Sequence, residues 1–527
     1  MKAAINHVLK LGVDAHKDGN VQAAQKFYEQ VLSIDPSNCD ANHNLGLITS
    51  STEHIELALK LFRNAVKSNP KVEQFWISYI DTLIKENHLK DADSAIKKAS
   101  KKKYGLSKNV VRALNEKLLH RLAVLSQQEG DLEGAAKAYK KLVAFKRGSM
   151  EPHFNLGVVL HRLTKFSQAE QSFRQAIAIQ PNSAETYFNL GTTLREQGDL
   201  KSSVSAYRRA ILLKPDYVEA MLNLSIILDF IGDIDGAIDQ LECVLELDAT
   251  HYGLWASVNL AIFRFLSDDF TACKQLLSSS LNIHKLSDKD LKNAQTYQQY
   301  LSRILHLRQN DPVEPVGLSL KEKLYVIGES HALVSHGLLV KGAGSLFQCK
   351  SFLIQGCKQW HLGNNTRNKF KIKFEDLVSS LPASSSVLIS IGEIDCRTET
   401  GILSYLKNHP EQNSANVVRK TVGSYLDYIS KLNLSFNHNV IIQGVPCPNI
   451  DAANFSEDEV KRLINIIQHF NAELMEIARA KKFGFLDVCA LTDRGDGFSN
   501  GIWHIDSYHL SREGMREAWR VHYSSSN

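Results

Sequence analysis

Residues 150–183 read MEPHFNLGVVLHRLTKFSQAEQSFRQAIAIQPNS, and residues 184–217 read AETYFNLGTTLREQGDLKSSVSAYRRAILLKPDY. The two stretches align without a gap, so the chain repeats itself with a period of 34 residues. Each carries a small residue, an aromatic residue, a second small residue and a closing proline, at Gly157, Phe173, Ala176 and Pro181 and again at Gly191, Tyr207, Ala210 and Pro215. A fixed period of this length indicates an array of similar helical hairpins.

The residue types at these positions have a mechanical explanation. Two helices that cross closely need glycine or alanine at the contact, an aromatic ring fills the space beside it, and a proline ends the second helix. The pattern resembles the tetratricopeptide (TPR) repeat. The resemblance implies a curved α-solenoid whose concave groove binds a protein or peptide, which the sequence does not identify.

Further copies of the pattern extend the array in both directions. We expect seven or eight repeats, which together with a closing helix fill residues 1–308. The other copies cover residues 5–38, 39–71, 73–106, 116–149 and 218–251, and a degenerate copy begins near Tyr252. Lys285–Gln309 is predicted to be the closing helix, because the last face of an array needs a polar cap.

The rest of the chain has a different pattern. Residues 309–320 contain two prolines and a glycine and are predicted to form a linker. After them, short apolar runs that mostly end at glycine alternate with helix-like stretches, which indicates an α/β domain with a buried parallel sheet over residues 321–527. The expected strands are 323–328, 351–355, 386–392, 439–444 and 483–488. Ligands bind beyond the carboxyl ends of the strands in such sheets.

Two motifs at opposite ends of this domain carry chemistry. The sequence Gly328-Glu329-Ser330-His331 follows the first strand. A serine at such a turn exposes its hydroxyl, and its backbone N–H lies near a helix N-terminus as a donor to an oxyanion. Asp506 and His509 lie three residues apart, so their side chains can meet on one turn. The carboxylate would then hold the imidazole in the tautomer that accepts the serine proton.

Together the two motifs resemble the SGNH (GDSL-like) hydrolase family, which has its nucleophile after the first strand and a D-x-x-H block near the C-terminus. Residues 510–514, LSREG, match the continuation of that block. The resemblance implies a flavodoxin-like α/β/α domain in which Ser330 is the nucleophile, His509 the base and Asp506 its orienting acid. It also implies hydrolysis of a carbohydrate O-acyl ester, a lipid or another small acyl ester, without a metal or organic cofactor.

The third block of the family, G-x-N-D, is altered in this chain. Ile394 stands where the family has asparagine, so one side-chain donor to the oxyanion is missing, a loss worth about 3–4 kcal/mol of transition-state stabilisation. If the stretch is extended, Glu393, Asp395 and Arg397 point to one side. Arg397 then either donates to a substrate oxygen or forms a structural ion pair with a carboxylate.

The second block of the family supplies a backbone N–H from a glycine after the second strand. Gly356 and Gly363 are the two candidates in this chain. The resemblance favours Gly363 slightly, because Asn364 and Asn365 follow it in a polar loop. The alternative is that both glycines are turn residues.

Two other chemistries are weaker matches. The serine turn also resembles the G-x-S-x-G elbow of α/β-hydrolases, but in those enzymes the serine lies mid-sheet and the acid and base come from separate loops. A metal site is the second alternative, although the spacing of its ligands is weak evidence. Its ligands would be His504, Asp506, His509 and Asp395. Three other histidines are expected at the polar surface or at helix caps: His331, His336 and His361.

The composition narrows the function further. A net charge of +5 over 527 residues gives no reason to expect nucleic acid or an anionic membrane as a partner. The eight cysteines are scattered without a C-x-x-C pair, as in proteins of a reducing compartment. The N-terminus does not read as a signal peptide, and no apolar stretch reaches about 18 residues. We therefore expect a cytoplasmic protein without a membrane span.

The sequence thus predicts an SGNH-type serine esterase that is joined to a TPR array for protein–protein interaction. Two alternatives remain open. The same triad would serve an O-acyltransferase if water were excluded from the site. The chain could instead be a TPR scaffold whose SGNH domain binds a ligand without turnover, and the isoleucine at position 394 is the reason to consider it.

Overall fold

The computed structural model describes residues 2–52, 54–101, 106–146, 148–247, 252–279, 289–309, 322–341 and 346–524. The chain forms two compact units, Met1–Leu190 and Gly191–Asn527. The predicted linker at 309–320 lies, except for Gln309, outside the described residues. The domain boundaries drawn from the sequence stay a prediction.

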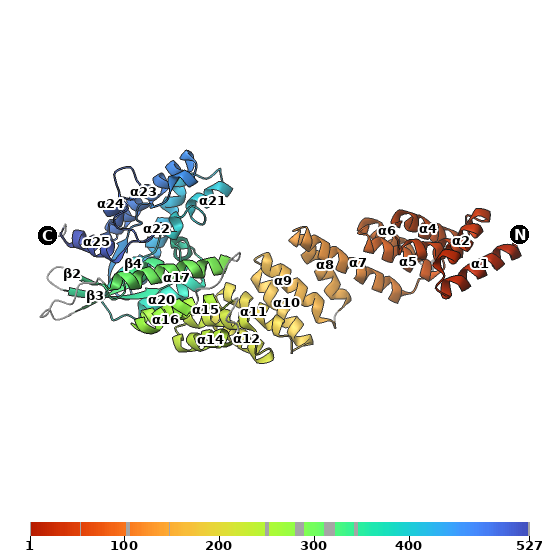
Figure 1. The fold of residues 1–527 in the computed structure, drawn as a ribbon, viewed down its shortest axis with the longest axis horizontal. Helices are drawn as coiled ribbons and strands as arrows, with labels where there is room; N and C mark the ends of the chain where they lie inside the picture. Colours follow the sequence, from red (N-terminus) through yellow and green to blue (C-terminus); the bar gives the residue numbers. More distant parts are fainter. Residues whose placement is uncertain are drawn as a thin grey trace. The chain divides into compact units, whose positions relative to one another are not determined.

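In the part of the chain that the structure describes, the first sixteen helices form successive hairpins (Figure 1). Their order confirms the predicted helical repeats, including the degenerate copy near Tyr252. The helices are α1 (Lys2–Lys17), α2 (Val21–Ile34), α3 (Cys39–Thr49), α4 (Ile55–Ser68), α5 (Glu73–Lys85), α6 (Leu89–Ala99), α7 (Lys108–Gln128), α8 (Leu132–Phe145), α9 (Met150–Arg162), α10 (Phe166–Ile179), α11 (Ala184–Gln197), α12 (Leu200–Leu213), α13 (Val218–Phe230), α14 (Ile234–Leu247), α15 (Gly253–Leu266) and α16 (Phe270–Ser279).

In the two repeats that open at residues 150 and 184, the glycine and the aromatic residue are in direct contact, as the pattern predicts. A Cβ atom added at Gly157 would lie 2.6 Å from the ring of Phe173, and one added at Gly191 would lie 3.0 Å from the ring of Tyr207. Both rings are fully buried. The repeat therefore needs glycine because any side chain would push the two helices of the hairpin apart.

The α/β part, residues 322–524, contains a six-stranded sheet in the order β2-β3-β1-β4-β5-β6. All neighbouring strands are parallel except β2 and β3. The five predicted strands are confirmed, and the short edge strand β2 was not predicted. The strands are β1 (Glu322–Gly328), β2 (Leu339–Lys341), β3 (Leu346–Leu353), β4 (Ser386–Ser390), β5 (Asn439–Gln443) and β6 (Gly484–Leu486).

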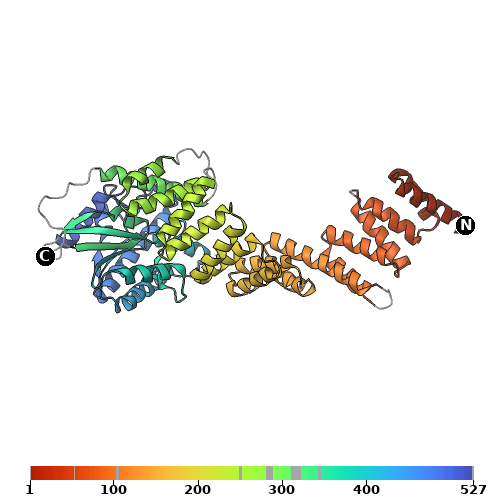
Figure 2. The ribbon, with the colours of Figure 1, turned by 90° about the horizontal axis from the view of Figure 1, so that it is seen from below.

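Helices cover both faces of this sheet (Figure 2). Neighbouring strand residues such as Val326 and Ile327 belong to two different apolar cores, because successive side chains of a strand point to opposite faces. The helices are α18 (Ser330–Ser335), α19 (Gln359–Gly363), α20 (Lys369–Ser380), α21 (Ile402–Asn408), α22 (Ser414–Asn433), α23 (Glu457–Ala480), α24 (Val488–Thr492) and α25 (Arg512–Ser524), with 3-10 turns η2 (Ile394–Cys396) and η3 (Ala452–Asn454).

The closing helix of the array, α17 (Lys289–Arg308), is part of one of these two cores. Leu301 and Ile304 of α17 are fully buried, together with Phe265 of the last hairpin and with Leu333 and Trp519 of the α/β part. The helix exposes polar residues such as Gln295, Gln299 and Ser302, as expected of a closing helix with a polar cap. Its other face is apolar and packs on the α/β part, which the sequence did not predict.

A second contact joins helix α13 to helix α20. The rings of Phe230 and Phe370 meet edge to face with their centroids 5.9 Å apart. Beside them the Asp229 carboxylate pairs with the ammonium group of Lys373, a residue that is only 6% exposed. Aromatic packing next to a shielded ion pair fixes where helix α13 meets helix α20.

None of the helices in the described ranges is long and apolar enough to span a membrane. All eight cysteines are free thiols. The cytoplasmic location stays a prediction.

The shared core predicts how fragments of the chain behave. A fragment of residues 322–527 loses helices α15 to α17 and exposes Leu333, Val334 and Trp519, so we expect it to aggregate. A fragment of residues 184–527 keeps this core and should be monomeric with a cooperative thermal transition. Gel filtration and circular dichroism of both fragments test this. A monomeric 322–527 fragment that melts at the same temperature as the longer one would contradict it.

Candidate active site

Ser330 occupies the first position of helix α18, directly after strand β1. A Cβ atom at Gly328 would lie 2.4 Å from the carbonyl oxygen of Ser390, so glycine is required where β1 and β4 end side by side. This close approach fixes the turn that carries Glu329 and Ser330. Ser330 is only 3% exposed.

The structure brings Ser330, His509 and Asp506 together as predicted. Ser330 Oγ lies 2.7 Å from His509 Nε2, and His509 Nδ1 lies 2.9 and 2.8 Å from the two carboxylate oxygens of Asp506. Burial raises the pKa of Asp506, but the hydrogen bond and charge of His509 outweigh it and hold that pKa well below its ordinary range. The carboxylate therefore stays ionised and orients the imidazole toward Ser330.

The loop that carries Asp506 and His509 is held by its own backbone. Asp506 Oδ1 accepts hydrogen bonds from the backbone N–H groups of Tyr508 and His509, both at 2.8 Å. The amide of Asn449 donates to the carbonyl oxygen of Asp506 at 3.1 Å. The acid and the base are thus placed by the same short turn, as their spacing of three residues suggests.

Glu329 makes an unexpected contact with the serine. Its Oε2 atom accepts a hydrogen bond from the Ser330 backbone N–H at 2.6 Å and lies 2.6 Å from the Ser330 hydroxyl. The hydroxyl has one proton, so Glu329 and His509 compete for it. The backbone N–H that the sequence predicts as an oxyanion donor is engaged by this carboxylate.

A compact set of buried charges surrounds Glu329. Glu329 Oε1 lies 3.6 Å from His331 Nδ1, and both residues are no more than 2% exposed. Burial acts against both ionised forms. Even so, His331 and Arg397 lower the pKa of Glu329. In turn, Glu329 and Glu393 raise the pKa of His331. The arrangement favours a glutamate–imidazolium pair next to the nucleophile.

The predictions for the three histidines have different outcomes. His331 is buried within helix α18 and is neither a surface residue nor a cap, so its prediction is wrong. His336 is also buried, but it is the C-cap residue of α18, which agrees with the helix-cap prediction. His361 accepts a hydrogen bond from the Lys358 backbone N–H at the start of helix α19, which confirms its role as a helix cap. His331 was missed because a histidine beside a serine gives no sign of burial in the sequence.

The stretch around Ile394 is not extended. Residues 394–396 form a 3-10 turn, so Glu393 and Arg397 face each other while Asp395 points elsewhere. Arg397 donates to both carboxylate oxygens of Glu393 at 2.6–2.9 Å, which is the ion-pair alternative of the sequence analysis. The guanidinium also lies over the ring of Tyr508, 5.0 Å from its centroid.

Asp395 supports helix α19 instead of the serine. Its Oδ2 atom accepts the backbone N–H of Gln359 at 2.8 Å, at the N-terminus of that helix. Burial raises the pKa of Asp395 to about 7, although the backbone donors of Gln359 and Trp360 act in the other direction. The residue is therefore a buried cap with a pKa in the physiological range.

The two candidate glycines have different surroundings. Gly363 lies in helix α19, where an added Cβ atom would lie 2.9 Å from the backbone nitrogen of Tyr425 in α22. Helix packing alone explains that glycine. Gly356 has a φ of +72° and open space around its missing Cβ, and it follows Ile354, whose N–H donates to the carbonyl of Gly328 at 2.7 Å. Gly356 thus lies in the turn after β3, two residues beyond the one that bonds to the end of β1.

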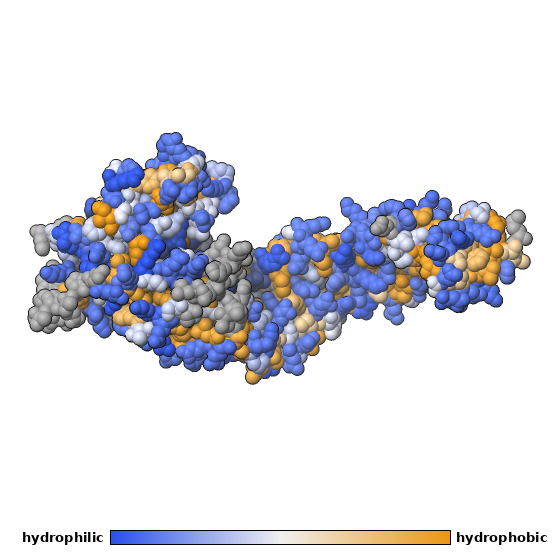
Figure 3. Space-filling model, viewed as in Figure 1, coloured by the Kyte–Doolittle hydropathy of each residue, from blue (hydrophilic) through white to orange (hydrophobic). Residues whose placement is uncertain are grey.

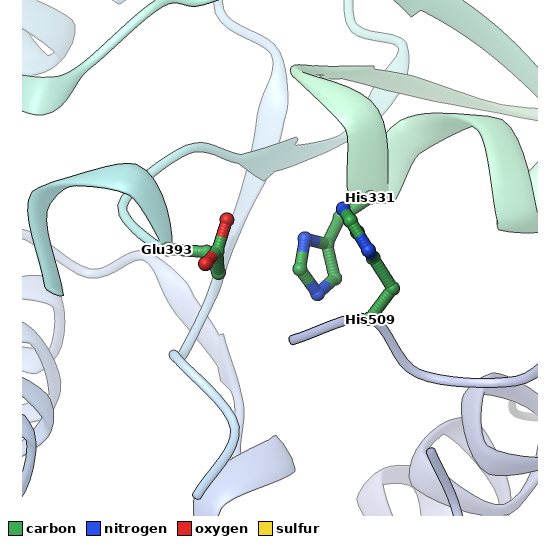
Figure 4. Close-up of side chains that lie close together, drawn as sticks. All are labelled: His331, Glu393 and His509. Atoms are coloured by element: carbon green, nitrogen blue, oxygen red, sulfur yellow. The ribbon is translucent and has the colours of Figure 1, made fainter. Parts of the chain in front are cut away.

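His331, Glu393 and His509 lie together in Figure 4, with candidate ligand atoms within 4.8 Å of one another. This is a different set from the one considered in the sequence. Arg397 already binds Glu393 through two nitrogens, and both ring nitrogens of His509 have partners. A cation would have to displace these bonds, so the donor set fits a charge network better than a metal site.

Tyr300 of helix α17 also reaches the triad, and the sequence did not point to it. The ring of Tyr300 stacks on His509 with centroids 4.2 Å apart, and its hydroxyl donates to the carbonyl oxygen of Ser330 at 3.3 Å. Tyr297 lies one turn earlier on the same helix and is half-buried. A spacing of three residues is visible in the sequence, but nothing there places the helix on the triad.

Models of the tetratricopeptide repeat match residues 149–214, 188–250 and 11–38. The helix array contains tetratricopeptide repeats. These TPR repeats occur where the sequence predicts them, and they support an array that binds a protein partner.

Solved structures resemble parts of the chain at low identity. They include the MamA RS-1 ArsTM double mutant (16% identity, 34% of this chain, 96% of that chain, TM-score 0.31) and MamA 41-end from Desulfovibrio magneticus RS-1 (17%, 32%, 93%, 0.30). Pseudomonas aeruginosa PilF is similar at 18% identity over 42% of this chain and 96% of that chain, with a TM-score of 0.27. No curated protein matches the sequence.

The raised pKa of Asp395 predicts a pH effect on stability. Between pH 4 and pH 7 the folded protein binds the Asp395 proton more tightly than the unfolded chain, so stability falls as the pH rises, by at most about 4 kcal/mol. Above the folded pKa the effect levels off. Asp395→Asn should remove this slope, as measured by urea unfolding at pH 5 and pH 8. Asp376→Asn, at an exposed site, is the control. If the stability of Asp395→Asn depends on pH as that of the wild type does, the pH effect does not come from Asp395.

Proposed function

We propose that the α/β part is a serine-dependent esterase of the SGNH type, with Ser330 as nucleophile, His509 as general base and Asp506 as the residue that orients it. The unbroken relay from Asp506 through His509 to Ser330, with distances of 2.8 and 2.7 Å, is the observation that carries the proposal. A parallel sheet with the serine at the carboxyl end of β1 agrees with it.

The relay defines the steps of the reaction. Ser330 Oγ attacks the acyl carbon while its proton passes to His509 Nε2, and the carbonyl electron pair moves to the oxygen. The tetrahedral intermediate collapses, and the imidazolium gives its proton to the leaving alcohol. Water then attacks the acyl-enzyme while His509 takes its proton, and the bond from Ser330 Oγ to the acyl carbon breaks as His509 returns that proton to Ser330. Glu329 must release the Ser330 N–H before that group can bind the oxyanion.

Gly356 is the better candidate for the second backbone N–H that donates to the oxyanion. It follows the residue that pairs with the end of β1, and its missing side chain leaves space beside the serine turn. Gly363 is accounted for by helix packing. We therefore move this role from Gly363, which the sequence favoured slightly, to Gly356.

The burial of the site bears on the substrate. Ser330 is 3% exposed and His509 4% exposed, with helix α17 packed beside them. A small acyl group reaches such a hydroxyl more easily than a long chain does. Acetyl esters, including those of carbohydrates, are the substrate class that this geometry favours.

The same burial supports the second candidate, acyl transfer. A site that excludes water protects an acyl-enzyme from hydrolysis and allows another hydroxyl to accept the acyl group.

A non-catalytic role remains the alternative suggested by Ile394 and by the carboxylate on the Ser330 N–H. The TPR array would bring a protein partner in each case, and exposed apolar residues gather over the N-terminal repeats (Figure 3): Leu11, Val21, Ile34, Leu47 and Leu57.

The triad is tested by hydrolysis of p-nitrophenyl acetate. Ser330→Ala and His509→Ala should each lower kcat by about 10⁴-fold or more, because the nucleophile and the base act as a unit. The control is Ser384→Ala, at a serine on the surface turn before β4. Equal activity in wild type and Ser330→Ala would refute the triad. Loss of activity in EDTA that returns with zinc would point to the His331, Glu393 and His509 cluster.

The acyl preference and the acceptor are tested together. We expect kcat/KM to fall from the acetyl to the butyryl and octanoyl esters of p-nitrophenol, because helix α17 limits the space at Ser330. Adding a monosaccharide acceptor should leave the product purely hydrolytic for an esterase, as followed by mass spectrometry. An acylated sugar that forms with wild type and not with Ser330→Ala would favour transfer. Equal kcat/KM values for the three esters would contradict the argument that helix α17 limits the space at Ser330.

A further inference from the structure

The proposed esterase lacks the side-chain donor that its family places at position 394. In the structure Ile394 lies in the 3-10 turn η2 and offers no polar group. The Ser330 N–H is bonded to Glu329. A side-chain donor for the oxyanion would therefore have to come from another element near Ser330 Oγ.

Helix α17 approaches both halves of the triad. Tyr300 stacks on His509 and donates to the carbonyl oxygen of Ser330. One turn later, the Arg303 guanidinium donates to the carbonyl oxygen of Ile505 at 2.9 Å, next to Asp506. Two points of attachment, one to each motif, fix the position of this helix over the site.

Tyr297 lies one turn before Tyr300, on the face of α17 that meets the site. Its side chain packs against the core that α17 shares with the α/β part, and the charges of Glu329 and Arg397 act on its hydroxyl. Burial raises its pKa, and the nearby Glu329 carboxylate raises it further, so the phenol keeps its proton near neutral pH. A neutral phenol next to the attacking oxygen is a hydrogen-bond donor of the kind that oxyanion sites use.

We propose that helix α17 of the repeat array completes the active site, with the Tyr297 hydroxyl as the side-chain donor to the oxyanion and Tyr300 as the positioning residue for His509. The inference rests on the proposed esterase function. When Ser330 Oγ bonds to the acyl carbon, the carbonyl electron pair becomes an oxyanion and the serine proton moves to His509. Tyr297 keeps its own proton and directs it at the new negative charge.

Tyr300 acts through His509 and does not touch the reacting carbon. Its ring is 2% exposed and covers one face of the imidazole. The ring thus prevents the imidazole from tilting away from Ser330. The stacking and the hydroxyl contact are separate, because only the ring touches His509.

The inference is tested with p-nitrophenyl acetate and full-length protein. Tyr297→Phe should lower kcat by about 10²-fold with little change in KM, because it removes a donor that acts in the transition state. Tyr405→Phe is the matched control, since Tyr405 is a surface residue of α21 with 43% exposure. The rate at which a fluorophosphonate probe labels Ser330 gives a second readout and should fall in parallel.

Three outcomes are distinguishable. A Ser330-dependent activity that falls in Tyr297→Phe and not in Tyr405→Phe supports the inference. The same activity at wild-type level in Tyr297→Phe overturns it and leaves the esterase function intact. Equal turnover in wild type and Ser330→Ala removes the esterase function, and the inference with it.

Tyr300 is tested by comparing two substitutions. Tyr300→Phe retains the stacked ring and should restore most of the kcat that Tyr300→Ala loses. Tyr300→Ala should lower kcat about tenfold at unchanged KM, the loss expected when a base is less well oriented. Thermal melting shows whether the alanine variant is folded. If it is not, Tyr300→Leu, which fills space without stacking, replaces it. Wild-type kcat in a folded variant without the ring overturns the positioning role.

Discussion

The structure depends on one apolar core that the repeat array and the α/β part build together. Leu301 and Ile304 of helix α17 fill it from one side, and Leu333 and Trp519 fill it from the other. The apolar sides of helices α18 and α25, which cover this face of the sheet, would be exposed without these array helices. Burial of these apolar sides is therefore what brings Tyr297 and Tyr300 to the serine, and the arrangement of the site follows from hydrophobic packing.

The second constraint is electrostatic. Glu329, Glu393, His331 and Arg397 lie around the serine with little access to water, and each negative group has a positive neighbour. Buried charges are costly unless they are paired, so removing any one of them leaves another unbalanced. The network explains why Glu329 can remain ionised beside the nucleophile. It also accounts for Arg397, whose three hydrogen bonds hold Glu393 in place.

Much of this could be predicted from the sequence where the signal is local or periodic. The helical hairpins follow from a period of 34 residues, the five parallel strands from apolar runs, and the meeting of Asp506 with His509 from their spacing. Contacts between distant segments could not be predicted in this way. Nothing near Tyr300 indicates that it stacks on a histidine more than 200 residues later, and the 3-10 turn at Ile394 depends on the surrounding fold.

The stacking of Tyr300 on His509 has a consequence for how such chains can be recombined. The segment between α17 and β1 looks like a natural crossover point for exchanging modules, since a helical array ends before it and a sheet begins after it. A crossover there would join His509 to a helix from another lineage, without the ring that covers its imidazole. Only exchanges that carry α17 along with the sheet would pass on an intact site, so inheritance of the two parts is coupled.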